Sequence, residues 1–246
     1  MHHSNNRTEL ILSKEGLDKL EKSKVLVVGL GGVGACAAEM LCRAGIGHLT
    51  LVDFDMVSET NINRQLIALT NTVGRRKTEV LKERLKLINN NVDLRIINSY
   101  INEENVDSIF DINYDYVVDA IDTLSPKVSL IKFCVDKQIP LISSMGAGAK
   151  LDPERVKITD ISKSEYCPLA HMLRKRLHRL GIRKGFKVVF STEPTIESAV
   201  ILSEEHNKKT IVGTISYLPI VFGCFCASAV IRDLTKLAAS VKPSSK

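Results

Sequence analysis

The chain has 246 residues, 44% of them hydrophobic and 25% charged, and a formal net charge of +6. This length and composition suit one folded α/β domain with a sizeable core, and they exclude a collagen-like or intrinsically disordered chain. The excess of basic residues is compatible with a polyanionic partner. Whether there is such a partner depends on where the basic residues lie.

Strand-like and helix-like patterns alternate along the first half of the chain. The predicted strands, in chain order, are 24–29, 48–53, 92–99, 116–119 and 140–144, and the predicted helices are 8–22, 35–44, 76–89, 103–110 and 127–136. Buried apolar strands that alternate with helices at this spacing are typical of a parallel, doubly wound sheet. We therefore predict a Rossmann-like α/β fold with a mostly parallel sheet.

The pattern changes after Gly148. Strand-like runs at 156–161 and 187–191 lie on either side of a basic helix, and no internal repeat appears. We therefore predict one domain with an elaborated second half. The predicted parts of this domain, residues 1–246, are a Rossmann-like part at 8–150, a variable part at 151–234 and a flexible tail at 235–246.

An uncharged run at 211–231 is long enough to cross a bilayer. Its glycines, its proline and its strand-forming first residues fit a buried strand at 211–217, a turn and a helix better, so we expect no membrane partner. The six cysteines form no C-x-x-C pair, which excludes a zinc ribbon. No basic-then-apolar leader opens the chain, so we expect no signal peptide, reduced thiols and a cytoplasmic protein.

A glycine-rich motif links the first predicted strand to the next helix. Gly29, Gly31, Gly32 and Gly34 lie in a G-x-G-x-x-G pattern. Glycines there let the backbone approach a phosphate, and the helix amino end offers free N–H groups to it. Asp53, at the end of the second strand, suits a ribose hydroxyl. The motif alone also fits a NAD-binding domain, so it predicts a nucleotide site without choosing the nucleotide.

The segment after Asp53 favours ATP. It contains Asn61 and Arg64, and Lys77 follows a short distance later. A hydride-transfer enzyme has no need for such a cationic run, whereas an enzyme that cleaves ATP between its α- and β-phosphates does. We expect Arg64 and Lys77 to hold the departing pyrophosphate and Asn61 to add a hydrogen bond.

The same residues resemble the ubiquitin-activating superfamily, which includes the bacterial enzymes that adenylate sulfur-carrier proteins. The matching parts are the glycine loop, the pattern D-x-D-x-V-x-x-x-N-x-x-R-Q from Asp53 to Gln65, the following Gly–Lys, and Asp119-Ala-Ile-Asp122. The resemblance implies ATP and Mg²⁺ as cofactors, with Asp55 in the ATP site and Asp122 serving Mg²⁺ and the reacting phosphate. It also implies a homodimer in which Arg7 reaches ATP in the neighbouring subunit and assists catalysis there.

The second half resembles one branch of this superfamily, the tRNA threonylcarbamoyladenosine dehydratases. The matching segments are 143–153, the Cys167-Pro-Leu-Ala-His run, 174–183, 213–223 and 227–232. The resemblance extends over about residues 7–234, so that 8–150 is implied to bind ATP and 151–234 to face the substrate tRNA. Cys167 and Ala149 depart from the Asp and Asn that are usual in the branch, which leaves substrate-side details open.

The implied reaction is an ATP-dependent cyclisation of threonylcarbamoyladenosine in the anticodon loop of a tRNA, through an acyl-adenylate of the threonyl carboxylate. One alternative is adenylation of the C-terminus of a small sulfur-carrier protein. Another is a NAD-dependent oxidoreductase or a non-catalytic nucleotide sensor. Ring closure needs no external nucleophile, although Cys167 stays a candidate. The resemblance also leaves open a monovalent cation, Na⁺ or K⁺, and a sulfur-transfer protein partner.

A basic segment supports an RNA partner independently of the resemblance. From His171 to Lys187 there are seven Lys or Arg, two His and no acid, and Leu173, Leu177 and Leu180 form a narrow apolar stripe. Most of the charge should therefore face outward, where like-signed side chains can replace the counterions of an RNA backbone. The predicted RNA-binding residues are Arg174, Lys175, Arg176, Arg179 and Arg183, with no DNA partner expected.

Overall fold

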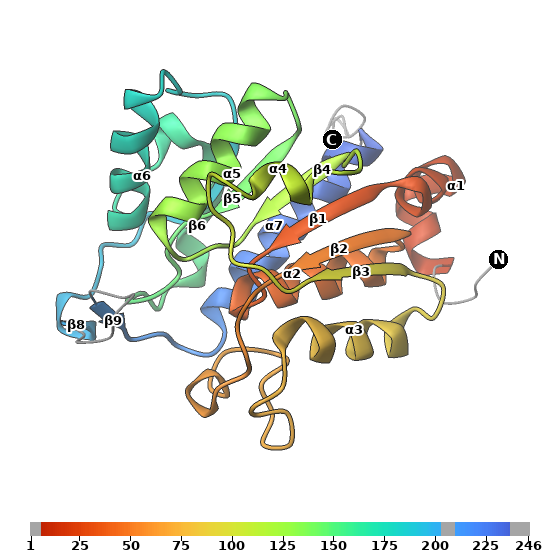
Figure 1. Ribbon diagram of the computed structural model, residues 1–246, viewed down its shortest axis with the longest axis horizontal. Coiled ribbons are helices and arrows are strands. Elements are labelled where there is room, and N and C mark those ends of the chain that lie inside the picture. The colour runs from red at the N-terminus through yellow and green to blue at the C-terminus, as the bar shows by residue number, and fades with distance from the viewer. Residues whose placement is uncertain (1–5, 203–209, 237–246) are drawn as a thin grey trace, which may run out of the picture.

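A mostly parallel sheet of seven strands runs through the computed structural model, which describes residues 6–202 and 210–236 (Figure 1). Its strands are β1 (Lys24–Val28), β2 (His48–Val52), β3 (Asp93–Ile97), β4 (Tyr116–Asp119), β5 (Leu141–Ser144), β6 (Val156–Asp160) and β7 (Lys187–Ser191). Their order across the sheet is β3-β2-β1-β4-β5-β7-β6. Every neighbouring pair is parallel except β6 with β7. The predicted Rossmann-like fold is confirmed, and the sheet takes strands from both halves of the chain.

Helices cover both faces of this sheet (Figure 1). They are α1 (Asn6–Lys22), α2 (Gly32–Ala44), α3 (Lys77–Ile88), α4 (Val106–Ile109), α5 (Leu124–Asp136), α6 (Pro168–Arg179) and α7 (Leu218–Thr235). Helices α1, α2, α3 and α7 share one hydrophobic cluster with the sheet, and α4, α5 and α6 share the other. Right-handed crossovers on opposite sides of β1 produce this division.

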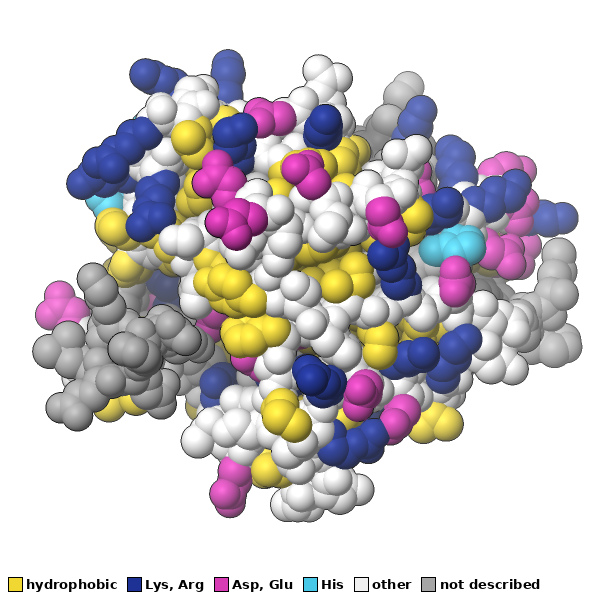
Figure 2. Space-filling view, in the orientation of Figure 1, with side chains coloured by type: hydrophobic (Ala, Val, Ile, Leu, Met, Phe, Trp, Pro, Cys, Tyr) yellow, Lys and Arg dark blue, Asp and Glu magenta, His cyan; other side chains and the backbone are white. Residues whose placement is uncertain are grey.

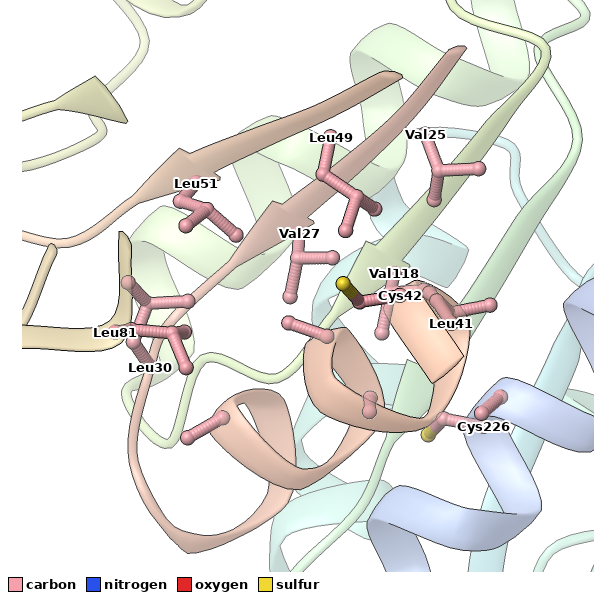
Figure 3. Close-up of a cluster of buried hydrophobic side chains, with 14 of the residues drawn as sticks. Val25, Val27, Leu30, Leu41, Cys42, Leu49, Leu51, Leu81, Val118 and Cys226 are labelled. Atoms are coloured by element: carbon pink, nitrogen blue, oxygen red, sulfur yellow. The ribbon is translucent and has the colours of Figure 1, made fainter. Parts of the chain in front are cut away.

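Alternating side chains of each central strand supply the two clusters. On β1, Val25 and Val27 join the α2 side, whereas Leu26 and Val28 join the α5 side. Figure 3 shows Val25 and Val27 pointing towards α2, which contributes Leu41 to the same cluster. A strand buried on both faces is expected to be continuously apolar, and the predicted 24–29 run shows this pattern.

Helices α2 and α4 differ from their predicted limits, and α5 begins at Leu124 and not at residue 127. Helix α2 begins at Gly32, not at residue 35, so Gly32 and Gly34 lie inside its first turn. We expected glycines to stay in the loop, but here they permit the close packing that starts the helix. Helix α4 is a single turn from Val106 to Ile109, because the polar run 102–105 forms a turn in place of the predicted first helical turn.

The expectation of a buried strand at 211–217 was wrong. Only β9 (Thr210–Val212) is a strand, paired antiparallel with β8 (Val200–Leu202) in a separate two-stranded sheet. Ile211 is 47% exposed and Val212 41% exposed. The apolar composition of this run is typical of a core strand, but β9 is exposed and pairs with β8. The sequence of β8 has no alternating apolar and polar pattern, so this pairing could not be predicted from it.

Helix α7 is long and apolar enough to cross a membrane by length and composition alone. In the structure it packs against α2 and α1 and against several strands of the sheet, and its Phe222, Cys226 and Val230 are buried. This packing accounts for its apolar character as that of a core helix. The helix ends at Thr235, and residues 237–246 of the predicted tail lie outside the described residues.

Candidate active site

Two loops meet at the edge of the sheet where the parallel strands end. The chain runs outward from β1 to β2 and β3 and then returns to β4 on the other side of β1. Ligands of open α/β sheets bind outside the carboxyl ends of the strands at such a switch point. The glycine loop 29–34 follows β1, and the segment 120–122 follows β4, so these two loops form the walls of the candidate site.

Gly29 and Gly34 make the tight turn between β1 and α2. Gly29 has φ of +84°, and a Cβ atom there would lie 2.8 Å from the carbonyl oxygen of Ala120. A Cβ atom on Gly34 would lie 1.7 Å from the carbonyl oxygen of Gly29. No side chain fits at either position, so the backbone itself lines this part of the site.

The amino end of α2 is suited to a phosphate. Its N-cap residue, Gly31, makes no side-chain capping bond, and the first N–H groups of a helix have no acceptor within it. Gln65 lies beside Gly31, and in the described part of the chain its buried Oε1 atom has no hydrogen-bond partner. Open N–H groups at a helix amino end attract anions, so this end fits the phosphates of ATP.

Residues distant in the sequence support the glycine loop from outside. A Cβ atom on Gly32 would lie 2.8 Å from the carbonyl oxygen of Arg64 and 2.7 Å from Cβ of Pro219. Pro219 belongs to the first turn of α7. The last helix of the chain therefore packs directly against the nucleotide loop.

Asp53, Asp55 and Lys77 form a charged group next to the loop. Asp53 Oδ2 accepts a hydrogen bond from the backbone N–H of Leu30 at 2.6 Å, and its Oδ1 accepts one from that of Asp55 at 2.8 Å. The buried Lys77 Nζ donates to Asp55 Oδ2 at 2.7 Å. Burial raises the pKa of Asp53, while Lys77 and the two N–H groups act to lower it. A carboxylate oxygen has further acceptor sites, so Asp53 can still accept a ribose hydroxyl.

Asn61 and Arg64 lie on the loop that follows β2. Asn61 Oδ1 accepts the backbone N–H of Ser58 at 3.1 Å, so its Nδ2 group is the end that can donate to a ligand. Arg64 Nη1 donates to the carbonyl oxygen of Thr60 and to Oδ1 of Asn63, both at 2.8 Å. A guanidinium has five N–H donors, so this anchoring holds Arg64 in place and leaves donors for a phosphate.

Asp122 is exposed on the segment that follows β4. Within the described ranges, 6–202 and 210–236, no three His, Cys, Asp or Glu side chains gather into a metal-binding group. Mg²⁺ requires fewer protein ligands, because it is commonly held by one or two carboxylates together with substrate phosphates. The position of Asp122 fits that arrangement.

A buried ion pair supports the Asp122 segment, and the sequence reasoning missed it. Lys127 Nζ lies 2.8 Å from Asp119 Oδ2, and both side chains are 0% exposed. Ser143 Oγ donates to the same carboxylate at 2.6 Å, and Lys127 Nζ also donates to the carbonyl oxygen of Ile121 at 2.9 Å. Lys127 therefore connects α5, β4 and β5 with the residue before Asp122. The one available signal was its spacing, because Lys127 lies three and four residues before the apolar Leu130 and Ile131 and so falls on the buried side of the helix.

Comparison with known proteins identifies the family. The ThiF family pattern matches residues 3–245. The tRNA threonylcarbamoyladenosine dehydratase of Bacillus subtilis is 41% identical over 248 residues, which cover 96% of each chain. The chain belongs to the ThiF family. This confirms the resemblance carried by the glycine loop, the Asp53–Gln65 pattern and the second half.

Solved structures agree with this ThiF-family assignment. The Escherichia coli tRNA N6-threonylcarbamoyladenosine dehydratase, TcdA, in complex with ATP has a TM-score of 0.87 and 34% identity, covering 96% of this chain and 95% of that one. A molybdopterin-synthase adenylyltransferase of Haemophilus influenzae is 37% identical over 138 residues, only 56% of each chain. The dehydratase similarity therefore includes the second half, whereas the adenylyltransferase similarity covers little more than half of either chain.

The basic residues of this ThiF-family chain gather on one surface. Figure 2 shows Lys and Arg side chains grouped over α6. Lys175, Arg176 and Arg179 are exposed on the helix, and Arg183 is exposed on the turn after it. The structure therefore places four of the five predicted RNA-binding side chains in solvent.

Arg174 and Leu180 differ from the expectation for this segment. Arg174 is partly buried, and its Nη1 donates to the carbonyl oxygen of Ser164 at 2.7 Å and to the Ser164 hydroxyl. Leu180 is 46% exposed, because α6 ends at Arg179. Ile182 takes the buried position that was expected for Leu180. The chain reverses at Gly181, which has a left-handed backbone, and this turn places Ile182 in the core.

Arg7 does not lie with the other predicted site residues in its own chain. It is exposed on α1, beside the end of the sheet where β1 begins, whereas the glycine loop follows the other end of β1 (Figure 1). Arg7 therefore does not join the ATP site of its own chain, and its role in a neighbouring subunit stays a prediction.

Cys167 lies at the start of α6, next to the segment that follows β5 and away from the ATP loop residues. It is buried at the N-cap of α6, with Sγ 3.6 Å from the position that a Cβ atom on Gly146 would take. Nearby, the 2%-exposed Lys150 donates to the carbonyl oxygens of Tyr166, at 3.1 Å, and Glu193. Burial lowers the pKa of Lys150. In the sequence, a single Lys after a glycine-rich turn resembles a surface residue, so no role was predicted for Lys150.

Proposed function

We propose that this protein is an ATP-dependent tRNA threonylcarbamoyladenosine dehydratase. The observation that carries the proposal is the similarity over nearly the full length to proteins of that name, one of which has been seen with ATP and with AMP. The phosphate-binding end of α2 and the cationic groups around it supply the chemistry that such an activity requires.

The reaction joins two steps on one carboxylate. The threonyl carboxylate of the modified adenosine attacks the α-phosphorus of ATP, and pyrophosphate leaves. The resulting mixed anhydride has a good leaving group, so the carbamoyl group of the same side chain attacks it and releases AMP. The nucleoside loses one water in total, and ATP becomes AMP and pyrophosphate. Neither step needs a cysteine nucleophile.

The site residues divide this work. The backbone of the glycine loop holds the phosphates and Asp53 the ribose, while Asn61, Arg64 and Lys77 stabilise the charge that develops on pyrophosphate. Asp55 keeps Lys77 oriented through their 2.7 Å ion pair. Asp122 would hold Mg²⁺ together with the phosphates, and the ion would supply further neutralising charge there. The proposal also includes a monovalent cation, Na⁺ or K⁺, near the site, and this part rests only on the family resemblance.

The decisive experiment measures AMP and pyrophosphate release with two tRNA samples, one carrying threonylcarbamoyladenosine and one lacking it. Release should require the modified tRNA, and mass analysis of its nucleosides should show the loss of one water. Release that proceeds equally with unmodified tRNA, or only with a small carrier protein, would remove the dehydratase assignment and favour sulfur-carrier adenylation.

The proposal includes a homodimer with Arg7 shared between subunits. Arg7→Ala should lower AMP formation and leave the fold intact, because the side chain is exposed and distant from its own ATP site. Mixed with an Asp122→Asn protein, it should regain activity, since each heterodimer contains one complete site. Activity is followed by AMP release over a range of mixing ratios. No recovery on mixing, despite heterodimers seen by native mass spectrometry, would exclude the shared site.

The proposal also places RNA on the exposed basic surface of α6. Changing Lys175, Arg176 and Arg179 together to Glu should weaken tRNA binding and reduce the magnitude of its log–log salt slope by about 2 to 3, at about 0.7 to 0.9 per lost phosphate contact. The matched control reverses the exposed lysines of α1, namely Lys14, Lys19 and Lys22. The two triple variants change net charge equally, so a similar effect in both would mean that only overall charge matters.

A reducing compartment, the cytoplasm, is the proposed location. All six cysteines are free, including Cys36 and Cys224, whose sulfur atoms share a hydrogen bond of 3.8 Å and form no disulfide. A sulfur-transfer protein is retained as a proposed partner on the resemblance alone.

A further inference from the structure

A cleft of about 630 Å³ lies between the start of α6 and the connection from β7 to β8. One wall is formed by Tyr166, Cys167, His171 and Arg174, and the other includes Thr195 and Glu197. None of these residues belongs to the proposed ATP site. Clefts of roughly 300 to 1,000 Å³ accommodate small molecules, so this one is large enough for a nucleobase with its sugar.

Tyr166 gives the cleft an aromatic surface at its rim. Its side chain is 59% exposed, and its backbone has φ of +49°, a left-handed conformation that a bulky side chain rarely adopts. Such a conformation persists only where the surrounding structure holds it. The Tyr166 ring is therefore exposed on a backbone that the surrounding structure holds in place, where it can stack on a ligand.

Lys150 holds the two walls of the cleft together. Its buried ammonium donates to the carbonyl oxygen of Tyr166 on one side and to that of Glu193, the residue before Pro194 of the cleft, on the other. The Glu193 carboxylate in turn accepts the backbone N–H groups of Leu151 and Asp152. Burying an ammonium is costly unless it is fully hydrogen-bonded, so these contacts make the cleft a preformed feature.

The charge around the cleft suits a polyanion. His171 and Arg174 lie in its wall, and the exposed Lys175 follows directly on α6. Arg174 is anchored through Nη1 alone, which leaves guanidinium donors for a ligand. Glu197 is the one acidic side chain among the lining residues. An aromatic face beside basic side chains is the usual arrangement for binding an unstacked base of single-stranded RNA.

A continuous series of contacts joins the cleft to the ATP site. Cys167 packs against Gly146, and a Cβ atom on Gly148 would lie 3.0 Å from Oγ1 of Thr214. Asn63 Nδ2, next to Arg64, donates to the carbonyl oxygen of Thr214 at 2.9 Å. A base in the cleft and a carboxylate at the ATP phosphates can therefore belong to one RNA loop.

We propose that this cleft binds an unpaired nucleobase of the substrate RNA, stacked on Tyr166, in the same loop as the nucleotide whose carboxylate is adenylated. The inference rests on the proposed tRNA dehydratase function and deepens it by assigning a base-binding subsite. Phosphate contacts on α6 orient the RNA, whereas the base in the cleft sets the position of the anticodon loop relative to ATP.

The test compares Tyr166→Ala with Tyr166→Phe, using threonylcarbamoyladenosine-modified tRNA as substrate. Tyr166→Ala should raise KM for tRNA about tenfold or more, as expected for the loss of one stacked base, with KM for ATP unchanged. Tyr166→Phe keeps the ring and should stay within about twofold of the wild type. The salt slope of tRNA binding should not change, because no charge is removed. Met172→Ala, an exposed apolar truncation on α6 outside the cleft, is the matched control.

Synthetic anticodon stem-loops with single abasic positions identify the base. At one position, removing the base should weaken binding to the wild type but add nothing to the effect of Tyr166→Ala. Equal KM values for Tyr166→Ala and the wild type, or additive effects at every abasic position, would overturn the proposal. Tyr166→Gly, which suits the left-handed backbone, replaces the alanine variant if that variant does not fold.

The outcomes separate this inference from the function on which it rests. If the wild type does not require modified tRNA for AMP release, both the function and the cleft assignment fall. If the wild type does require it and the Tyr166 variants behave like the wild type, only the cleft assignment falls.

Discussion

Arg64→Ala and Asp122→Asn are each expected to lower AMP-forming turnover by about a hundredfold or more. Groups that meet charge developing in a transition state contribute about 3 kcal/mol each, which corresponds to this factor. Arg64 is anchored beside the glycine loop by Thr60 and Asn63, so its guanidinium is in place before ATP arrives. Asp122 follows the segment that Lys127 holds. The measurement is the single-turnover rate of AMP release with saturating modified tRNA.

Arg75→Ala is the matched control for this experiment. Arg75 lies on the same polar loop, but it pairs with Glu83 at the surface and not with the glycine loop. It should keep nearly full activity. Affinity for tRNA should survive in Arg64→Ala and Asp122→Asn, because these side chains face ATP. Full activity in both variants would refute the adenylation site itself.

Lys127→Met is expected to lower the free energy of unfolding by about 3 to 5 kcal/mol, the usual cost of leaving one member of a buried ion pair without its partner. Asp119 would stay at 0% exposure with Ser143 as its remaining side-chain partner. The Ile121 carbonyl would also lose its donor, which loosens the segment before Asp122. Urea unfolding followed by circular dichroism measures the loss.

The double variant Asp119→Asn with Lys127→Met separates charge burial from packing. It removes both charges, so it should recover a large part of the stability lost in Lys127→Met. Recovery of stability without recovery of turnover would show that Lys127 also positions Asp122. A loss below about 1 kcal/mol in Lys127→Met alone would contradict the ion-pair argument.

The parts of the fold that the sequence predicted are those in which local pattern and burial coincide. Val25 to Val28 are apolar on both sides, and the strand lies in the middle of the sheet. The glycines at 29 and 34 are required by a turn that admits no Cβ atom, so their spacing predicted the tight turn between β1 and α2. Strand order at the other edge, where β6 pairs antiparallel with β7, depends on contacts that no local pattern encodes.

Long-range contacts explain what the sequence did not reveal at the site. Lys127 is buried because its ammonium group pairs with Asp119, which β4 holds inside the sheet. Lys150 is buried because its ammonium group donates to the carbonyl oxygens of Tyr166 and Glu193, which lie 16 and 43 residues away in the chain. In the sequence each appears as an ordinary surface lysine. Ile211 and Val212 show the opposite case, since an apolar run forms an exposed hairpin. Whether a charged or apolar residue is buried depends on the residues that contact it in the folded protein, and a single sequence does not identify these contacts.

The contact of Pro219 with Gly32 has a consequence for how the protein is made. The glycine loop is translated long before α7. A growing chain can form its first strands as they emerge, but the phosphate-binding turn lacks its outer support until α7 folds against it. We therefore expect that a nascent chain adenylates no carboxylate until α7 has folded against the glycine loop.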